Sequence, residues 1–157
     1  MAKKLVLVTG PPGIGKTTLV LNVVRTLRER GISVGGIISR EIRSYGRRVG
    51  FEMIDIGSDE KETLASIYGQ GTRMGKYKVN LKGLAEFASK RLEEAMSRYE
   101  VVVCDEVGPM ELLSPEFRRT VLKLRSLDKP SIVVVPVSYT HLRAHETRHD
   151  LVCRLLL

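Results

Sequence analysis

Cysteine is scarce in this sequence of 157 residues, which contains only Cys104 and Cys153. The two lie far apart, and Cys104 sits inside an apolar run, so neither has a neighbour at metal-ligand spacing. This pattern excludes a disulfide framework and a cysteine-held zinc site. A chain with so few thiols is typical of a reducing compartment, and we therefore expect a cytoplasmic protein.

Long hydrophobic runs are also absent, although 43% of the residues are hydrophobic. No segment has the roughly 20 consecutive apolar residues that cross a bilayer, so no membrane partner is expected. The short apolar run after Lys4 leads straight into a glycine-rich loop, which is not the pattern of a secretory signal. Internal repeats and low-complexity linkers are missing too, and the length suits one domain.

Acidic residues are the minority, with 18 Asp and Glu against 26 Lys and Arg and a formal net charge of +8. The basic residues are spread among acidic ones throughout the chain. This balance permits contact with nucleic acid but does not indicate it, because a nucleotide substrate accounts for part of the excess equally well. Nothing in the sequence indicates an oligomeric state.

The strongest positive signal is a phosphate-binding loop at residues 10–17, which matches G-x-x-x-x-G-K-[ST] and follows the apolar run from Leu5 to Val8. Backbone N–H groups of such a loop converge on an anion because no Cβ blocks their approach, and the following helix adds its positive end. Lys16 is expected to reach the β- and γ-phosphates of a nucleoside triphosphate. Thr17 is expected to give one ligand to Mg²⁺. The alternative to a phosphate-binding loop is a plain turn that joins a strand to a helix. Such a turn does not require the Lys16-Thr17 pair.

A second site segment is predicted where the apolar run Val101 to Cys104 ends in Asp105 and Glu106. Open α/β sheets bind ligands at the carboxyl ends of their strands. Asp105 is expected to hold the Mg²⁺ through a water, and Glu106 to orient or deprotonate an attacking water. Lys16 and Glu106 are therefore the predicted catalytic residues, and Thr17 and Asp105 the predicted metal ligands.

The order of elements predicts a three-layer α/β domain whose mainly parallel sheet contains an inserted antiparallel hairpin. The chain opens with a strand, the loop and a helix with apolar residues from Leu19 to Leu27, capped at Gly31. Later helices are predicted from Asn80 to Arg98 and from Ser114 onward. The parallel strands are predicted at 4–8, 33–39, 101–104 and 131–135, the hairpin within 41–55, short strands at 60–66 and 76–80, and a loop at 68–75.

Glu106, which directly follows the predicted metal ligand Asp105, distinguishes a hydrolase from a kinase. A kinase must keep water away from the γ-phosphate, whereas a hydrolase needs a base for that water, so Glu106 favours hydrolysis. A nucleoside or polynucleotide kinase, and an RNA-binding module with a nucleotide switch, remain alternatives. Several basic residues could supply charge to a transition state, hold a second substrate or grip a polyanion: Arg40, Arg43, Arg47, Arg48, Arg73, Lys76 and Lys78.

The chain resembles the small nucleoside-triphosphatases of the THEP1 type, most specifically in the stretch from Asp105 to Leu112, and the resemblance covers about residues 1–135. It implies a RecA-like P-loop fold and Mg²⁺-dependent hydrolysis of ATP, GTP and other nucleoside triphosphates to diphosphate and phosphate. It also implies two nucleotide-binding segments. Together with the adjoining Thr18, they comprise Gly10, Pro11, Pro12, Gly13, Ile14, Gly15, Lys16, Thr17, Val101, Val102, Val103, Cys104, Asp105, Glu106, Val107 and Gly108.

The composition changes abruptly near residue 137, and the segment 137–157 contains all three histidines. This segment resembles translated adapter or vector sequence. We therefore expect a C-terminally truncated P-loop nucleoside-triphosphatase domain at 1–136 and a non-native tail at 137–157 that contributes little to the core or the site. In the alternative interpretation His141, His145 and His149, spaced four apart, form a metal-binding face on a helix.

Overall fold

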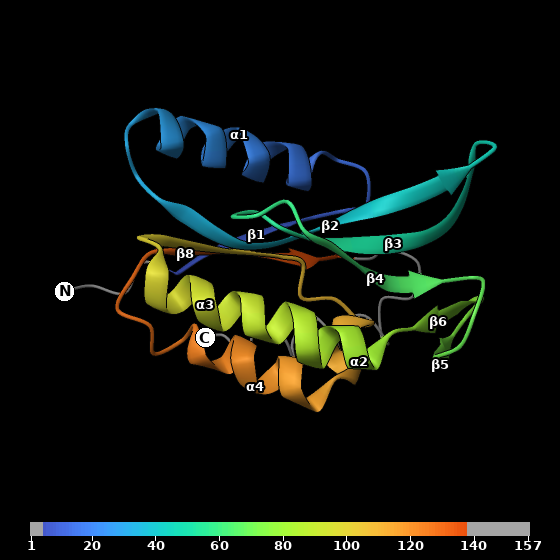
Figure 1. Ribbon diagram of the computed structural model, residues 1–157. Coiled ribbons are helices and arrows are strands. Elements are labelled where there is room, and N and C mark those ends of the chain that lie inside the picture. Colours follow the sequence, from blue (N-terminus) through green and yellow to red (C-terminus); the bar gives the residue numbers. More distant parts are fainter. Residues whose placement is uncertain (1–4, 138–157) are drawn as a thin grey trace.

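The structure is a computed structural model that describes residues 5–137, and these form an eight-stranded sheet with helices on both faces (Figure 1). Helix α1 (Lys16–Glu29) covers one face. Helices α3 (Ser89–Arg98) and α4 (Pro115–Lys123) cover the other. This three-layer α/β arrangement confirms the predicted fold class.

The strands lie in the order β1-β8-β7-β2-β3-β4-β6-β5. The first four are parallel neighbours, and each later pair is antiparallel. The carboxyl ends of β1 and β7 therefore meet at one edge of the sheet, as the sequence predicted. The bounds are β1 (Leu5–Gly10), β2 (Val34–Ser44), β3 (Arg47–Asp55), β4 (Lys61–Ser66), β5 (Thr72–Met74), β6 (Tyr77–Val79), β7 (Val101–Asp105) and β8 (Ser131–Pro136).

The hairpin is an extension of a parallel strand rather than a separate insertion. Strand β2 pairs with β7 over its first residues, continues to Ser44, and turns at Tyr45 and Gly46 into β3. The start of β2 is buried, and Gly36 passes the β7 backbone so closely that a Cβ there would lie 1.9 Å from the carbonyl oxygen of Val103. With three parallel and four antiparallel strand pairs, the sheet is mixed rather than mainly parallel as we expected, while the short strands expected at 60–66 and 76–80 are present as β4 and β6.

The expectation of a loop at 68–75 is wrong for its last residues, because Thr72–Met74 form β5 and pair with β6 around the turn Gly75-Lys76. Gly75 has φ 61°, which suits this tight connection. A three-residue strand with one apolar side chain, Met74, is too short to show a period of two in sequence.

Two of the predicted helix starts are confirmed by their caps. The side chain of Asn80 accepts a hydrogen bond from the Gly83 backbone N–H at 2.9 Å and begins a continuous helical segment. The Ser114 hydroxyl accepts one from Phe117 N–H at 3.2 Å, with Pro115 at the first helical position. The segment after Asn80 comprises α2 (Leu81–Gly83), the π-helical η1 (Leu84–Ala88) and α3; a 3₁₀ turn, η2 (Glu111–Leu113), precedes α4.

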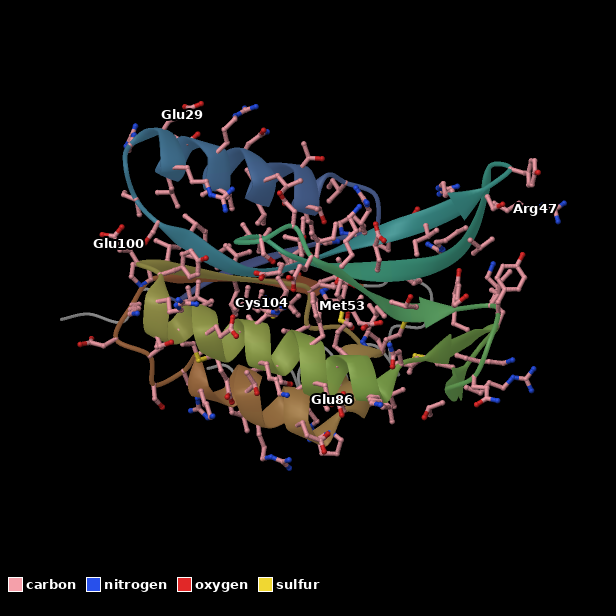
Figure 2. All side chains as sticks on the ribbon, in the orientation of Figure 1. Glu29, Arg47, Met53, Glu86, Glu100 and Cys104 are labelled. Carbon is pink, nitrogen blue, oxygen red and sulfur yellow. The ribbon has the colours of Figure 1, made fainter. Side chains whose placement is uncertain are left out.

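The sheet separates two hydrophobic cores. The core beneath α3 and α4 includes Leu92, Phe117 and the β7 residue Cys104, and the core beneath α1 includes Val20 and Val103. Alternate residues of β7 thus face opposite cores, and Figure 2 shows Cys104 between the sheet and the helices of the lower layer. Strand β7 is buried along its whole length, which fixes the position of its carboxyl end.

Within the described range, no helix is long and apolar enough to cross a membrane. The expectations for the tail, including the metal-binding face at His141, His145 and His149, fall on residues 138–157, outside the range that the structure describes. They remain predictions, as does the domain boundary at residue 136.

Candidate active site

The phosphate-binding loop connects β1 to α1 at the carboxyl edge of the sheet. Gly13 and Gly15 have φ of 76° and 101°, in the left-handed region that favours glycine. The Gly15 carbonyl accepts the first helical hydrogen bond, from Leu19 N–H at 2.9 Å, so α1 begins directly at the loop. The positive N-terminal end of a 14-residue helix is therefore aimed at the loop, as an anion site requires.

Lys16 folds back over this loop. Its ammonium donates hydrogen bonds to the carbonyl oxygens of Gly10 at 2.7 Å and Pro11 at 3.0 Å. The side chain is half-buried, and these bonds keep the charge at the mouth of the loop. A point charge held there faces an anion bound by the loop's N–H groups.

A cleft of about 530 Å³ connects the loop to the end of β7, the middle of β2 and the first half of β3. It is open to solvent and is lined by predicted phosphate-binding, metal-binding and catalytic residues. Residues of the β2–β3 hairpin also line it, and we call these residues the hairpin wall. The lining residues are Pro12, Gly13, Gly15, Lys16, Thr17, Thr18, Ser39, Arg40, Glu41, Arg48, Phe51, Asp105, Glu106 and Pro136.

Asp105 ends β7 and is only 1% exposed. Burial raises the pKa of its carboxyl to about 6, although the neighbouring Thr17 hydroxyl and the charge of Lys16 lower it. One carboxyl oxygen, Oδ2, is buried with no hydrogen-bond partner in the part of the chain that the structure describes. Such an orphaned oxygen needs a cation or a water, since an unpaired buried acceptor costs free energy.

Thr17 and Asp105 fit a Mg²⁺ ion. Both offer hard oxygen donors, and Thr17 lies close enough to Asp105 for its hydroxyl to influence the carboxyl. No cluster of three or more His, Cys, Asp or Glu suited to a metal occurs among residues 5–137, so no all-protein metal cage is found there. Two protein ligands are typical of Mg²⁺, which retains waters and binds substrate phosphates.

Glu106 lines the same cleft as Lys16 and Asp105. Burial and the negative charge of Asp105 together raise the pKa of its carboxyl to about 7, against the opposing effect of Lys16. The backbone of the next residue, Val107, donates to the Val134 carbonyl at 2.8 Å, which ties this turn to β8. A carboxyl with a pKa near 7 suits a general base at neutral pH.

Glu111 is a buried acid that the sequence interpretation missed. Its side chain is folded back by η2, is 4% exposed, and accepts a hydrogen bond from Gly108 N–H at 3.1 Å. Burial raises the pKa of this carboxyl to about 8, and the charge of Glu106 adds to the effect. Glu111 therefore supports the turn that carries Glu106, from a position outside the cleft.

We expect the Glu111→Gln variant to gain stability relative to the parent protein as the pH rises from about 4.5 to 8. In that interval the folded state keeps the Glu111 proton, whereas the unfolded chain, with its ordinary pKa of 4.5, has lost it. The unfolded state then binds fewer protons, so the free energy of unfolding falls with rising pH. Glutamine keeps a carbonyl acceptor for Gly108 but does not titrate.

Urea unfolding of both proteins between pH 5 and pH 8.5 measures this effect. The two free energies of unfolding should diverge toward high pH. Parallel profiles would contradict the assignment of a raised pKa to Glu111.

The two predicted nucleotide-binding segments contribute differently to the cleft. From the loop, Pro12, Gly13, Gly15, Lys16, Thr17 and Thr18 line it, whereas Gly10, Pro11 and Ile14 do not. From the second segment only Asp105 and Glu106 reach it. The other residues of this segment are buried in or beside β7 and support its end: Val101, Val102, Val103, Cys104, Val107 and Gly108. Their part in nucleotide binding stays a prediction.

The seven basic residues singled out in the sequence differ in whether they reach this cleft. Arg40 and Arg48 line it, and the other five predicted candidates do not: Arg43, Arg47, Arg73, Lys76 and Lys78. Sequence reasoning did not single out Ser39, Phe51 or Pro136, which complete the wall. No local motif marks them, because β2, β3 and β8 bring them together only when the sheet forms.

The sequence matches the NTPase family over residues 5–154. The nucleoside-triphosphatase THEP1 of Thermofilum pendens is 43% identical over 136 residues, which cover 86% of this chain and 75% of that protein. The nucleoside-triphosphatase THEP1 of Methanopyrus kandleri is 45% identical over 130 residues, covering 83% of this chain and 72% of that protein.

Two solved structures share the fold. A crystal structure of THEP1 from the hyperthermophile Aquifex aeolicus has a TM-score of 0.72 at 31% identity and covers 92% of this chain and 83% of its own. A solution structure of a human cancer-related nucleoside triphosphatase has a TM-score of 0.72 at 27% identity and covers 96% and 85%, respectively.

Proposed function

The chain belongs to the NTPase family whose curated members include the THEP1 nucleoside-triphosphatases, and from this premise we propose that it hydrolyses the γ-phosphate of nucleoside 5′-triphosphates, ATP and GTP among them. The products are the nucleoside diphosphate and inorganic phosphate. The observation that carries the proposal is that the phosphate-binding loop, the buried acid Asp105 and a second acid, Glu106, with a pKa near 7 line one cleft.

The loop and Lys16 bind the triphosphate. The backbone N–H groups of residues 12–17 and the N-terminal end of α1 surround the β-phosphate, and the ammonium of Lys16 contacts the β- and γ-phosphates. For this contact Lys16 exchanges its hydrogen bonds to the Gly10 and Pro11 carbonyls for phosphate oxygens, which are stronger acceptors for a cation.

Thr17 and Asp105 would hold the Mg²⁺ that accompanies the triphosphate. When bound, this ion neutralises charge on the phosphate oxygens. The unpaired Oδ2 of Asp105 supports the assignment, because a cation near that oxygen supplies the partner that the described residues lack.

Glu106 takes the proton of the attacking water. As the water oxygen forms a bond to the γ-phosphorus, the bond from that phosphorus to the β–γ bridging oxygen breaks, and the diphosphate leaves with the electron pair. The proton moves to the carboxylate of Glu106, whose pKa near 7 allows it to accept the proton and release it to solvent in each cycle.

Chelation of divalent cations is expected to stop phosphate release, and added Mg²⁺ to restore it. The Asp105→Asn variant should need a higher Mg²⁺ concentration for half-maximal activity, because an amide is a weaker ligand than a carboxylate. Titration of activity with Mg²⁺ at fixed ATP measures this. Equal Mg²⁺ requirements in the two proteins would contradict a metal role for Asp105.

A nucleoside or polynucleotide kinase and an RNA-regulated nucleotide switch are distinguished by one experiment. Phosphate release from ATP is measured alone, with nucleosides or oligonucleotides as phosphate acceptors, and with RNA. Hydrolysis predicts release without any addition. Transfer to the acceptor in place of release would identify a kinase, and release only with RNA would identify the switch.

We propose the cytoplasm as the site of action, because a chain with so few cysteines is typical of a reducing compartment. Cys104 is a free cysteine in the interior, and burial raises the pKa of its thiol, so it behaves as a small apolar core residue. A buried free thiol is compatible with the cytoplasm as the site of action.

A further inference from the structure

Arg48 is the most firmly held of the basic residues that line the cleft. Its Nε donates to the Tyr77 hydroxyl at 2.9 Å, and its Nη1 donates to Glu41 at 3.0 Å. The guanidinium also lies over the Phe51 ring, 5.3 Å from its centroid, and 6.0 Å from that of Tyr77. Three elements, β2, β3 and β6, thus fix one charged group.

The partners of Arg48 are themselves anchored. Tyr77 is 7% exposed, and the Phe51 and Tyr77 rings pack edge to face with centroids 5.3 Å apart. The Arg48 side chain is 43% exposed, and its Nη2 has no hydrogen-bond partner among residues 5–137. The Nη2 edge of the Arg48 guanidinium, a residue that lines the cleft, is therefore available to bind an anion.

Arg48 lies on the side of the cleft toward which the γ-phosphate of a bound triphosphate would point. In the sheet, β8 and β7 separate the loop strand β1 from β2 and β3, so the end of β7, with Asp105 and Glu106, lies between the loop and the hairpin. Figure 1 shows the β2–β3 hairpin projecting past the N-terminal end of α1. A triphosphate bound by the loop with its γ-phosphate toward Glu106 therefore points at the hairpin wall.

Arg40, the other basic residue of this wall, is less suited to meet the phosphate. Its Nε and Nη2 both bond to Glu52 Oε1, so a single partner on β3 holds it, whereas Arg48 is held by partners on three strands. Its side chain is 55% exposed. Preorganised donors stabilise a transition state better than mobile ones, since no reorganisation is needed as charge develops.

We propose that Arg48 is a catalytic residue that contacts the γ-phosphoryl oxygens in the transition state of hydrolysis, with Tyr77 as its positioning residue. The guanidinium and Lys16 line one cleft and together neutralise the charge on the transferred group. This inference rests on the proposed function and assigns a transition-state role to one of seven basic residues that the sequence could not separate.

The test measures steady-state phosphate release and two binding affinities in Arg48→Ala and Arg48→Lys. We expect kcat to fall about 100-fold or more, with KM changed by less than about threefold, because the lost contact forms only in the transition state. Affinity for ADP alone should be unchanged, whereas affinity for ADP with Mg²⁺ and aluminium fluoride, which mimics the transferred group, should fall in parallel with kcat.

Arg47→Ala is the matched control. Arg47 adjoins Arg48, lies at the hairpin tip pointing away from the body (Figure 2), and does not line the cleft, so its loss should leave kcat unchanged. Tyr77→Phe, which keeps the ring and removes the hydroxyl that holds Nε, should lower kcat by a smaller factor than Arg48→Ala. Thermal unfolding of each variant identifies any loss of fold, and Arg48→Lys, with its retained charge, keeps the test usable if Arg48→Ala unfolds.

The outcomes separate the inference from the proposed function. If the parent protein releases no phosphate, the proposed function fails. If the parent hydrolyses ATP and a folded Arg48 variant keeps its kcat, or loses only ADP affinity, Arg48 is a surface or nucleotide-binding residue and the inference is wrong. A loss of kcat in Arg40→Ala but not in Arg48→Lys would assign the role to Arg40 and also overturn it.

Discussion

Replacement of Glu106 by glutamine is expected to leave triphosphate binding intact and to lower kcat by about 1,000-fold. Glutamine has nearly the same shape but cannot accept a proton, so it removes only the base. Because Glu106 carries a pKa near 7 in the free parent protein, the log of kcat/KM, which reports ionisation of the free enzyme, should also rise with pH up to about that value. The glutamine variant should lose this rise.

Equilibrium binding of a fluorescent triphosphate and phosphate release, measured on one preparation of Glu106→Gln, check both parts of this expectation. Glu86→Gln is a suitable control, since Glu86 is exposed on the η1 segment beneath the sheet and remote from the cleft (Figure 2). Turnover at the parental rate in Glu106→Gln would show that another group activates the water.

Replacement of Lys16 by alanine is expected to weaken triphosphate binding by about 100-fold or more and to abolish measurable turnover. Loss of a charge-assisted contact to phosphate removes up to about 3 kcal/mol, and a tenfold change in affinity corresponds to about 1.4 kcal/mol. The effect should be larger for ATP than for ADP, because Lys16 contacts both the β- and γ-phosphates.

Titration calorimetry with ATP and with ADP provides the measurement. Lys90→Ala is the matched control, because Lys90 is exposed on α3, away from the cleft. Near-parental ATP affinity in Lys16→Ala would place the triphosphate elsewhere on the protein.

The phosphate loop and the two acids could be predicted because their signals are local. The motif at residues 10–17 encodes its own turn and helix start, and a buried strand that ends in Asp105 and Glu106 places both side chains at the carboxyl edge. The caps at Asn80 and Ser114 were predictable for the same reason, since each is formed within three residues.

The hairpin wall of the cleft could not be predicted, because it depends on distant pairings. Arg48 meets Tyr77 only after β3 pairs with β4 and β4 pairs with β6, which joins residues 29 apart. Glu111 is buried because η2 turns its side chain back toward Gly108, whereas in sequence it is one more acid in a loop. Charge and spacing alone therefore could not distinguish Arg48 from its neighbours.

Hydrolysis of ATP in ¹⁸O-labelled water, under single-turnover conditions with the parent protein in excess, tests the central claim most directly. Attack of water on the γ-phosphorus at the cleft predicts one ¹⁸O atom in inorganic phosphate and none in ADP, with no acceptor added. Label in ADP would show attack at the β-phosphorus. Absence of labelled phosphate, with ADP and an unlabelled phosphate ester formed only when an alcohol acceptor is supplied, would show a kinase, and either result would contradict γ-phosphate hydrolysis by this protein.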